Sequence, residues 1–223
     1  MSIRKIKFVS GEYYHVYNRG NSKQKLFLDK EDYTRFVSLL YACNQDSALR
    51  MDNLPKGETL YDIDREKPLV FIGAYCLMPN HFHLVVTQSD NADAGISTFL
   101  QKVSTGYSMY FNKKYKRVGS LFEGKFKSQY ADSDEYLKYL FSYVHLNPVK
   151  LIQKDWKEVG IKNKKQAIGY LSKYVYSSYL DYLGESRIQN KILDRKHFPK
   201  YFPSKNLFIK DIFEWLSFRD SLL

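Results

Sequence analysis

The chain has 223 residues, of which 44% are apolar, enough for one large domain with a buried core. Lysine and arginine number 35 against 24 aspartate and glutamate residues, so the formal net charge at pH 7 is +11. Such an excess favours a polyanionic partner, either a nucleic acid or an anionic membrane surface. No stretch approaches the roughly 18 uninterrupted apolar residues of a membrane-spanning helix, which argues against a membrane protein.

The N-terminal residues lack the apolar segment of a signal peptide, so we expect a cytoplasmic protein. Cys43 and Cys76 are isolated and lack the close spacing of a zinc ribbon or a disulfide framework. The two cysteines are therefore expected to be ordinary thiols.

The first third of the chain predicts a strand, a helix and a loop. Residues 11–22 alternate aromatic and β-branched side chains before a turn cluster, which is typical of a strand. Asp29 precedes apolar residues at helical spacing and predicts a capped amphipathic helix. Residues 46–67 mix charges with asparagine, proline and glycine, and we interpret them as a loop or a local insertion.

The next segments predict a hairpin, two helices and a short strand. Two apolar runs, residues 69–77 and 81–87, are separated by a proline-asparagine turn and predict two central strands. Residues 95–115 have helical periodicity and lead into a loop and a strand. Ser133 is a plausible cap for another helix, which Pro148 is expected to stop.

The order strand, helix, strand, strand, helix, strand, helix predicts the α+β class, as a ferredoxin-like (RRM-like) antiparallel sheet with helices packed on one face. We expect residues 1–150 to form this domain. Residues 151–223 change in character, and residues 170–183 and 210–223 have helical spacing. They predict a helical, basic C-terminal extension.

Two histidines one residue apart stand inside the second apolar run of the hairpin. Residues two apart on a strand point to the same face, so His81 and His83 project together while Phe82, Leu84 and Val86 fill the other face. Two neighbouring imidazoles form half of a metal site. From spacing alone, a pair of hydrogen-bonded histidines at a sheet edge is an equal alternative.

The helix after Ser133 carries an aromatic stripe. Positions four apart share a helical face, so Tyr139, Tyr143 and Asn147 lie together, with Tyr136 one turn earlier. Asn147 precedes a proline, which disfavours the helical conformation, so its side chain is expected to reach outward at the helix end. His145 lies off this stripe and is interpreted as structural or as a substrate contact. Core packing is the alternative explanation for the stripe.

The segments "YCLMPNHFHLVV", "LFEGKFKS" and "YVHLNPVK", in this order, resemble the HUH single-tyrosine transposases, and most closely the REP-associated tyrosine transposases. The resemblance covers roughly residues 11–150. It implies a metal-dependent endonuclease and strand transferase for single-stranded or hairpin DNA that cuts through a covalent phosphotyrosine. It also implies that Tyr143 is the nucleophile, that His81, His83 and Asn147 bind the metal, and that this metal is Mg²⁺ or Mn²⁺.

A basic stretch interleaved with aromatic residues follows the histidine hairpin. Cations that track phosphates and aromatic rings that stack on bases make up single-strand binding surfaces. A solvated helix end is the alternative. Arg19, at the end of the first strand, is a further candidate phosphate contact. The candidate DNA-binding residues are Arg19, Lys113, Lys114, Lys116, Arg117, Lys125 and Lys127.

Two other functions fit the same residues. One is a nucleic-acid-binding protein without catalysis, and the other is an HUH nuclease that initiates replication or conjugation. Both would retain the basic surface, and only the second would need the histidine pair. A homodimer is compatible with each of these functions.

Overall fold

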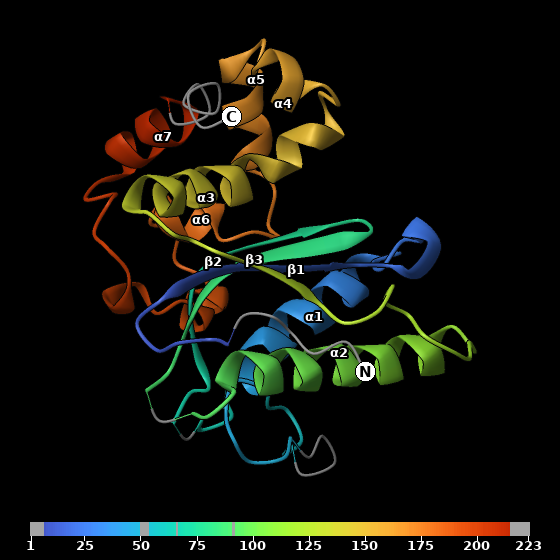
Figure 1. Ribbon diagram of the computed structural model, residues 1–223. Helices are drawn as coiled ribbons and strands as arrows, with labels where there is room; N and C mark the ends of the chain where they lie inside the picture. Colours follow the sequence, from blue (N-terminus) through green and yellow to red (C-terminus); the bar gives the residue numbers. More distant parts are fainter. Residues whose placement is uncertain (1–6, 50–53, 66, 91, 215–223) are drawn as a thin grey trace.

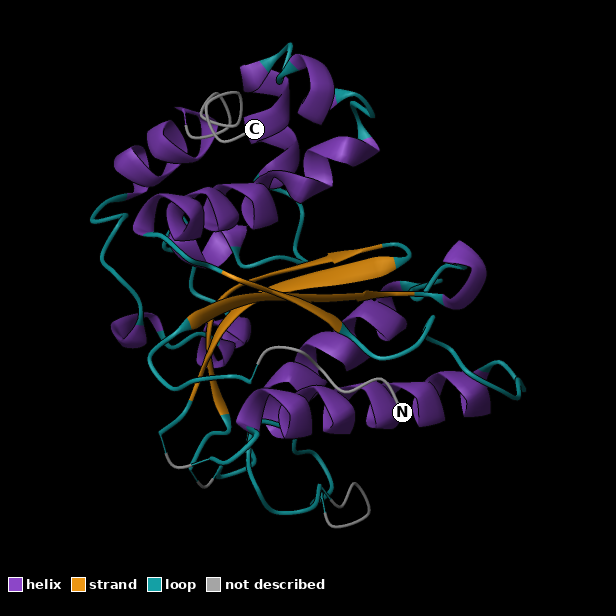
Figure 2. Cartoon of the chain, viewed as in Figure 1, coloured by secondary structure: helices purple, strands orange, loops and turns teal. Residues whose placement is uncertain are grey.

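The computed structural model describes residues 7–49, 54–65, 67–90 and 92–214. A four-stranded antiparallel sheet lies between two helical layers (Figure 1; Figure 2). The sheet has the order β2-β3-β1-β4, which is the ferredoxin-like arrangement, and the predicted α+β class is confirmed. Its strands are β1 (Tyr13–Arg19), β2 (Val70–Met78), β3 (His81–Gln88) and β4 (Lys127–Tyr130).

The first helical layer consists of α1 (Lys30–Ala42) and α2 (Gly95–Lys114), drawn below the sheet in Figure 1. The predicted cap of α1 is confirmed, because the Asp29 side chain accepts a hydrogen bond from the Asp32 amide and the Asp32 side chain accepts one from the Asp29 amide. Both helices bury their apolar stripes against one face of the sheet. The main core of the protein lies in this layer.

The second layer begins with α3 (Asp134–Leu146), which crosses the opposite face of the sheet (Figure 1). The expectation that the helices pack on one face only is therefore wrong. Phe141 and Val144 of α3 pack against Cys76 and Val85, whose side chains point away from the first layer. Since both faces of β2 and β3 carry apolar residues, neither face can be left to water.

Most of the C-terminal segment packs on α3, while residues 188–192 contact α1 and residues 195–197 contact β2 (Figure 1). A cluster that includes Trp156, Tyr179 and Phe208 packs on the end of α3. A domain boundary at residue 150 stays a prediction. Among the described residues, the α-helices of this segment are α4 (Trp156–Val159), α5 (Lys164–Leu171), α6 (Tyr179–Tyr182) and α7 (Lys205–Glu214). The 3₁₀ helices of the described residues are η1 (Asn21–Lys23), η3 (Asn147–Leu151), η4 (Ile188–Ile192) and η5 (Arg195–His197).

Residues 170–183 do not form the single helix that their spacing predicts. Between α5 and α6 the chain runs along β2, where the Leu77 amide donates to the Tyr176 carbonyl at 3.0 Å and the Ser178 amide donates to the Tyr75 carbonyl at 2.9 Å. An edge strand presents unpaired backbone groups that a neighbouring segment can satisfy. Pairing with β2 thus overrides the helical spacing. Most of the predicted final helix, residues 215–223, lies outside the described residues.

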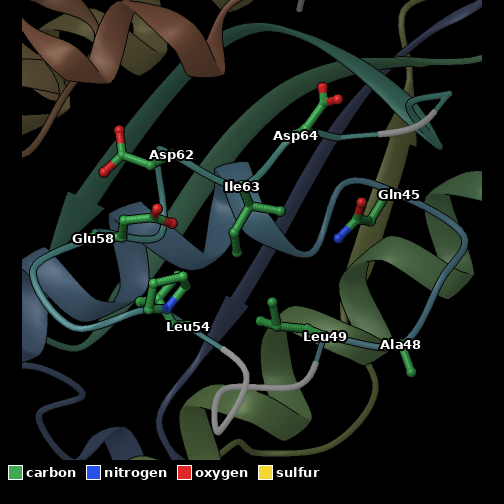
Figure 3. A pocket seen from close by; sticks show the side chains of 9 residues that line it. Gln45, Ala48, Leu49, Leu54, Glu58, Asp62, Ile63 and Asp64 are labelled. Carbon is green, nitrogen blue, oxygen red and sulfur yellow. The ribbon is translucent and has the colours of Figure 1, made fainter.

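The predicted insertion at residues 46–67 packs in the first layer. Its described residues contain turns and bends but neither a helix nor a strand. Together with the end of α1 they line a pocket of about 330 Å³, around which Leu49, Leu54 and Ile63 are placed (Figure 3). These side chains pack on the core beneath the sheet, on the side away from α3. Across the described residues, no helix has the length and apolar character that crossing a membrane requires.

Candidate active site

The two histidines of β3 point toward α3. Their neighbours Phe82, Leu84 and Val86 are buried in the core with α1 and α2, so the predicted division of the strand between two faces is confirmed. β3 lies between β1 and β2 and is a central strand. The predicted position of such a pair at a sheet edge is therefore wrong, because His81 and His83 lie beneath α3, and their role as metal ligands stays a prediction.

A third histidine, which the sequence analysis did not single out, completes this group. His15 lies on β1, and its Nε2 atom is 2.9 Å from Nδ1 of His83. The Nδ1 atom of His81 is 2.7 Å from the Asn80 side-chain oxygen. Both Nδ1 atoms are thus engaged, and the buried Nε2 atom of His83 has no hydrogen-bond partner among the described residues. Partners of this kind fix the tautomer of metal-binding histidines.

Tyr143 is brought to the histidines by α3. Its ring centroid lies 5.4 Å from that of His83 and 5.7 Å from that of His15, both edge to face. Lys157, on α4, donates a hydrogen bond of 2.7 Å from Nζ to the phenol oxygen of Tyr143. Burial raises the pKa of Tyr143 to about 12, so the phenol is protonated at neutral pH. Tyr139 stacks behind it at a centroid distance of 6.1 Å.

Asn147 lies at the end of α3, but the prediction that its side chain reaches outward is wrong. Its backbone is helical (φ −52°, ψ −38°) and its exposed fraction is 2%. Pro148 lies in the first turn of η3, where a proline costs no amide hydrogen bond, so the chain continues through it. The Oδ1 atom of Asn147 is buried and has no hydrogen-bond partner among the described residues. Burial lowers the pKa of His81 and raises that of Tyr143, and the side-chain amide of Asn147 reduces both shifts. Asn147 thus faces both groups.

The three histidines of the site are neutral at pH 7. Burial lowers the pKa of His15 and of His81 to about 4, and it lowers the pKa of His83 well below its ordinary value. The charge of Lys157 lowers all three pKa values further. Neutral imidazole is the form that binds metals.

The donors present fit a divalent cation. The Nε2 atom of His83 and the Oδ1 atom of Asn147 are buried, and neither has a hydrogen-bond partner in the described parts of the chain. Imidazole nitrogen with amide oxygen suits Mn²⁺ and, less well, Mg²⁺. In the described part of the chain, no three histidine, cysteine, aspartate or glutamate side chains could together hold a metal ion. Any metal bound at His81 and His83 would therefore need amide, water or substrate oxygen as further ligands.

A pocket of about 310 Å³ opens between the sheet and α3. Its walls are mostly aromatic and polar, and they come from β1, β3, β4, α3 and α4. The residues that line it are His15, Tyr17, His83, Gln129, Tyr136, Tyr139, Leu140, Tyr143 and Lys157. The pocket gives a ligand access to the phenol of Tyr143.

Two of the candidate DNA-binding residues lie on the site's face of the sheet. Arg19 is paired across the strands with His81, and Lys127 is paired with Tyr17. Residues paired in this way point to the same face. The guanidinium of Arg19 forms an ion pair with Glu123, with an Nη2–Oε1 distance of 2.6 Å.

The remaining basic candidates differ in their surroundings. Lys113, Lys116 and Lys125 are exposed. Arg117 is half-buried, with its guanidinium 5.6 Å from the ring centre of Phe111. Lys114 holds the end of α2 to the start of α1 through carboxylates within about 3 Å of its Nζ atom, those of Asp29, Glu31 and Asp32.

His145 is structural. It is buried under the C-terminal segment, with Nε2 2.8 Å from the Ser178 hydroxyl and its ring 4.8 Å from that of Tyr182. Burial lowers its pKa to about 3. Of the two readings that the sequence left open for this residue, its place between α3 and α6 favours the structural one.

We expect acid to destabilise the protein through its buried histidines. The folded-state pKa is about 3 for His145 and about 4 for His15, against about 6.5 in an unfolded chain. The unfolded chain therefore binds more protons below pH 6.5, so the stabilisation is complete above that pH and is lost as the pH falls toward 4 and 3. Each such histidine contributes a slope of up to about 1.4 kcal/mol per pH unit. Urea unfolding at pH 7, 5.5 and 4 measures it, and a flat profile would contradict the burial of these groups.

Comparison with known proteins finds a solved structure with a similar fold. No protein-family model and no curated protein matches the chain. A solved structure, that of a REP-associated tyrosine transposase bound to a REP hairpin, matches with a TM-score of 0.54. The match covers 85% of this chain and 90% of that one, at 13% sequence identity. The likeness is one of fold. It extends into the C-terminal segment, since 85% coverage exceeds what residues 1–150 alone would allow.

Proposed function

We propose that the protein is a metal-dependent endonuclease and strand transferase that acts on single-stranded DNA through a covalent phosphotyrosine at Tyr143. One observation carries the proposal: Tyr143 and His83 line one pocket with their rings 5.4 Å apart, the ring of His81 lies 4.9 Å from that of His83, and the amide of Asn147 interacts with both His81 and Tyr143. They come from β3 and from the end of α3, which are far apart in the sequence. The similar solved structure contains hairpin DNA, which makes a hairpin the substrate to test first.

The reaction would begin with attack of the Tyr143 phenol oxygen on the phosphorus of a DNA phosphodiester. A bond forms between this oxygen and phosphorus, one ester bond between phosphorus and a sugar oxygen breaks, and the phenol proton ends on the released sugar hydroxyl. The phosphotyrosine conserves the energy of the broken bond, so a second hydroxyl can displace the tyrosine and rejoin the strand without ATP.

The proposed metal ligands are His81 and His83, through their Nε2 atoms, and Asn147, through Oδ1. Their Nδ1 partners, Asn80 and His15, would hold the two imidazoles in the tautomer that leaves Nε2 free to bind. A divalent cation bound here would supply Lewis-acid stabilisation of the negative charge on the phosphate oxygens. The neutral state of all three histidines at pH 7 suits this role.

Cleavage of labelled hairpins tests the proposal. Purified protein is incubated with single-stranded DNA that carries the repeats next to its own gene, in the presence of Mn²⁺, Mg²⁺ or EDTA. We expect a metal-dependent cut and label transferred to the protein on a denaturing gel. Tight binding without a cut, on these hairpins and on a pool of random single strands, would favour the non-catalytic binding protein instead.

Arg19 and Lys127, on the site's face of the sheet, and the exposed Lys125, two residues before Lys127, are proposed to contact DNA phosphates. For single strands, log Kd changes with log salt by about 0.7 for each phosphate contact. Lys127→Gln and Lys125→Gln should each weaken binding and reduce the slope by about that amount. Lys114→Gln should leave the slope unchanged, because its ammonium group is occupied by carboxylates. Fluorescence anisotropy at several salt concentrations measures these slopes, and equal slopes for all three variants would contradict the proposed surface.

A further inference from the structure

The C-terminal segment places a cation on the phenol of Tyr143. Lys157 stands on α4, and its Nζ atom is 2.7 Å from the phenol oxygen and 4.1 Å from the centre of the ring. The same side chain lines the pocket between the sheet and α3. Lys157 therefore reaches the atom that would attack the phosphodiester.

The position of Lys157 is held by its neighbour. Trp156 is 1% exposed and is buried among residues of α3, α5 and α7. Its ring is inclined by 28° to that of Tyr143, at a centroid distance of 6.5 Å. Since α4 starts with this anchored residue, the following side chain is directed to the phenol rather than to solvent.

The direction of this hydrogen bond suits a nucleophilic tyrosine. The ammonium group donates and the phenol oxygen accepts, so the hydrogen bond strengthens as negative charge builds up on that oxygen. During attack the oxygen loses its proton, and during rejoining it departs as a phenolate. A fixed positive charge stabilises both transition states, because the charge at the oxygen is the same in the two directions.

We propose that Lys157 is a catalytic residue that stabilises the negative charge on the Tyr143 oxygen during cleavage and rejoining. The inference rests on the function proposed above. It gives the C-terminal segment a chemical role, since the sheet and α3 alone would bring the tyrosine and the histidines together without this cation.

The first test is single-turnover cleavage by Lys157→Gln and Lys157→Arg. Removing one donor from a developing oxyanion costs about 10² to 10³ in rate, so Lys157→Gln should cut about 10²-fold more slowly while its Kd for DNA stays near that of the wild type. Lys157→Arg, which keeps the charge, should recover part of the rate. Lys154→Gln is the matched control, because it removes an exposed lysine three residues earlier in the same segment and should cut normally.

A second measurement separates a chemical role from a structural one. With 3,5-difluorotyrosine at position 143, the phenolate is intrinsically more stable, so the rate loss in Lys157→Gln should shrink. The ¹⁹F resonance of 3-fluorotyrosine at the same position, recorded without DNA, should shift in Lys157→Gln and stay in place in Lys154→Gln.

These results distinguish the two proposals. If the wild type cuts DNA and Lys157→Gln cuts at the same rate, the role of Lys157 is overturned and the proposed function stands. An unmoved ¹⁹F resonance in Lys157→Gln overturns the contact whatever the activity. If the wild type cuts no DNA with any metal, both proposals fall together.

Discussion

Tyr143→Phe should abolish the covalent adduct with DNA and slow cleavage by at least about 10³-fold. Loss of an essential nucleophile reduces turnover by several orders of magnitude even when substrate still binds. The substitution removes a single oxygen from a half-buried ring, so the stacking on Tyr139 and the edge contact with His83 are retained. Label transfer to the protein and single-turnover rates on hairpin DNA measure both effects.

The neighbouring tyrosines provide the controls. Tyr139→Phe and Tyr136→Phe remove the same atom from rings that line the same pocket one and two turns earlier on α3, respectively. Both variants should still form the adduct. Formation of the adduct by Tyr143→Phe, or its loss in Tyr139→Phe alone, would assign the nucleophile to another residue.

Local signals in the sequence were sufficient for most of the fold. The alternation of β3, the capping carboxylate of Asp29 and the hydroxyl of Ser133 each act within a few residues, so their effects can be deduced from the order of the residues. The helix predicted from the spacing of residues 170–183 was wrong because this segment forms hydrogen bonds with the backbone of β2, about a hundred residues earlier.

Part of the site could also be predicted, because it depends on the local geometry of one strand and one helix. His81 and His83 share a face by strand geometry alone, and the helical repeat aligns Tyr143 with Asn147. His15 was missed because its contact with His83 depends on how β1 is aligned with β3, and no local pattern specifies this register. The alternation of His15, Tyr17 and Arg19 was nevertheless present in the sequence as a possible signal.

Lys157 could not have been found from spacing. It lies fourteen residues after Tyr143 and returns to it only because η3 and the following turns reverse the chain. The burial of Trp156 was equally hidden, since its partners come from three different helices. Contacts of this kind depend on tertiary packing, which overrides what a short window of sequence can specify.

Substitution of either histidine on β3 should remove metal binding and, with it, metal-dependent cleavage. Changes to groups that only support a metal ligand cost about 10- to 100-fold in metal affinity, so His83→Ala, which removes a proposed ligand, should cost more than about 100-fold. Isothermal titration with Mn²⁺ measures the affinity without DNA. In the cleavage assay, His83→Ala with Mn²⁺ should resemble the wild type in EDTA.

Substitution of two histidines outside this pair provides controls for the loss of Mn²⁺ affinity. His197→Ala removes an imidazole that stacks on Phe71 at a centroid distance of 3.4 Å and pairs with Asp194, in η5 rather than at the site. It should bind Mn²⁺ as the wild type does. His15→Asn should lower the affinity by about 10- to 100-fold, because His83 loses the partner that fixes its tautomer.

The order of the three effects is the informative result. If the imidazole Nε2 atoms bind the metal, Mn²⁺ affinity must fall most for His83→Ala, less for His15→Asn and not at all for His197→Ala. Equal Mn²⁺ affinity in the wild type and His83→Ala would show that the metal does not bind at this site. The buried and unpartnered Nε2 atom of His83 would then have to serve the DNA directly, as a hydrogen-bonding group for the phosphate beside Tyr143.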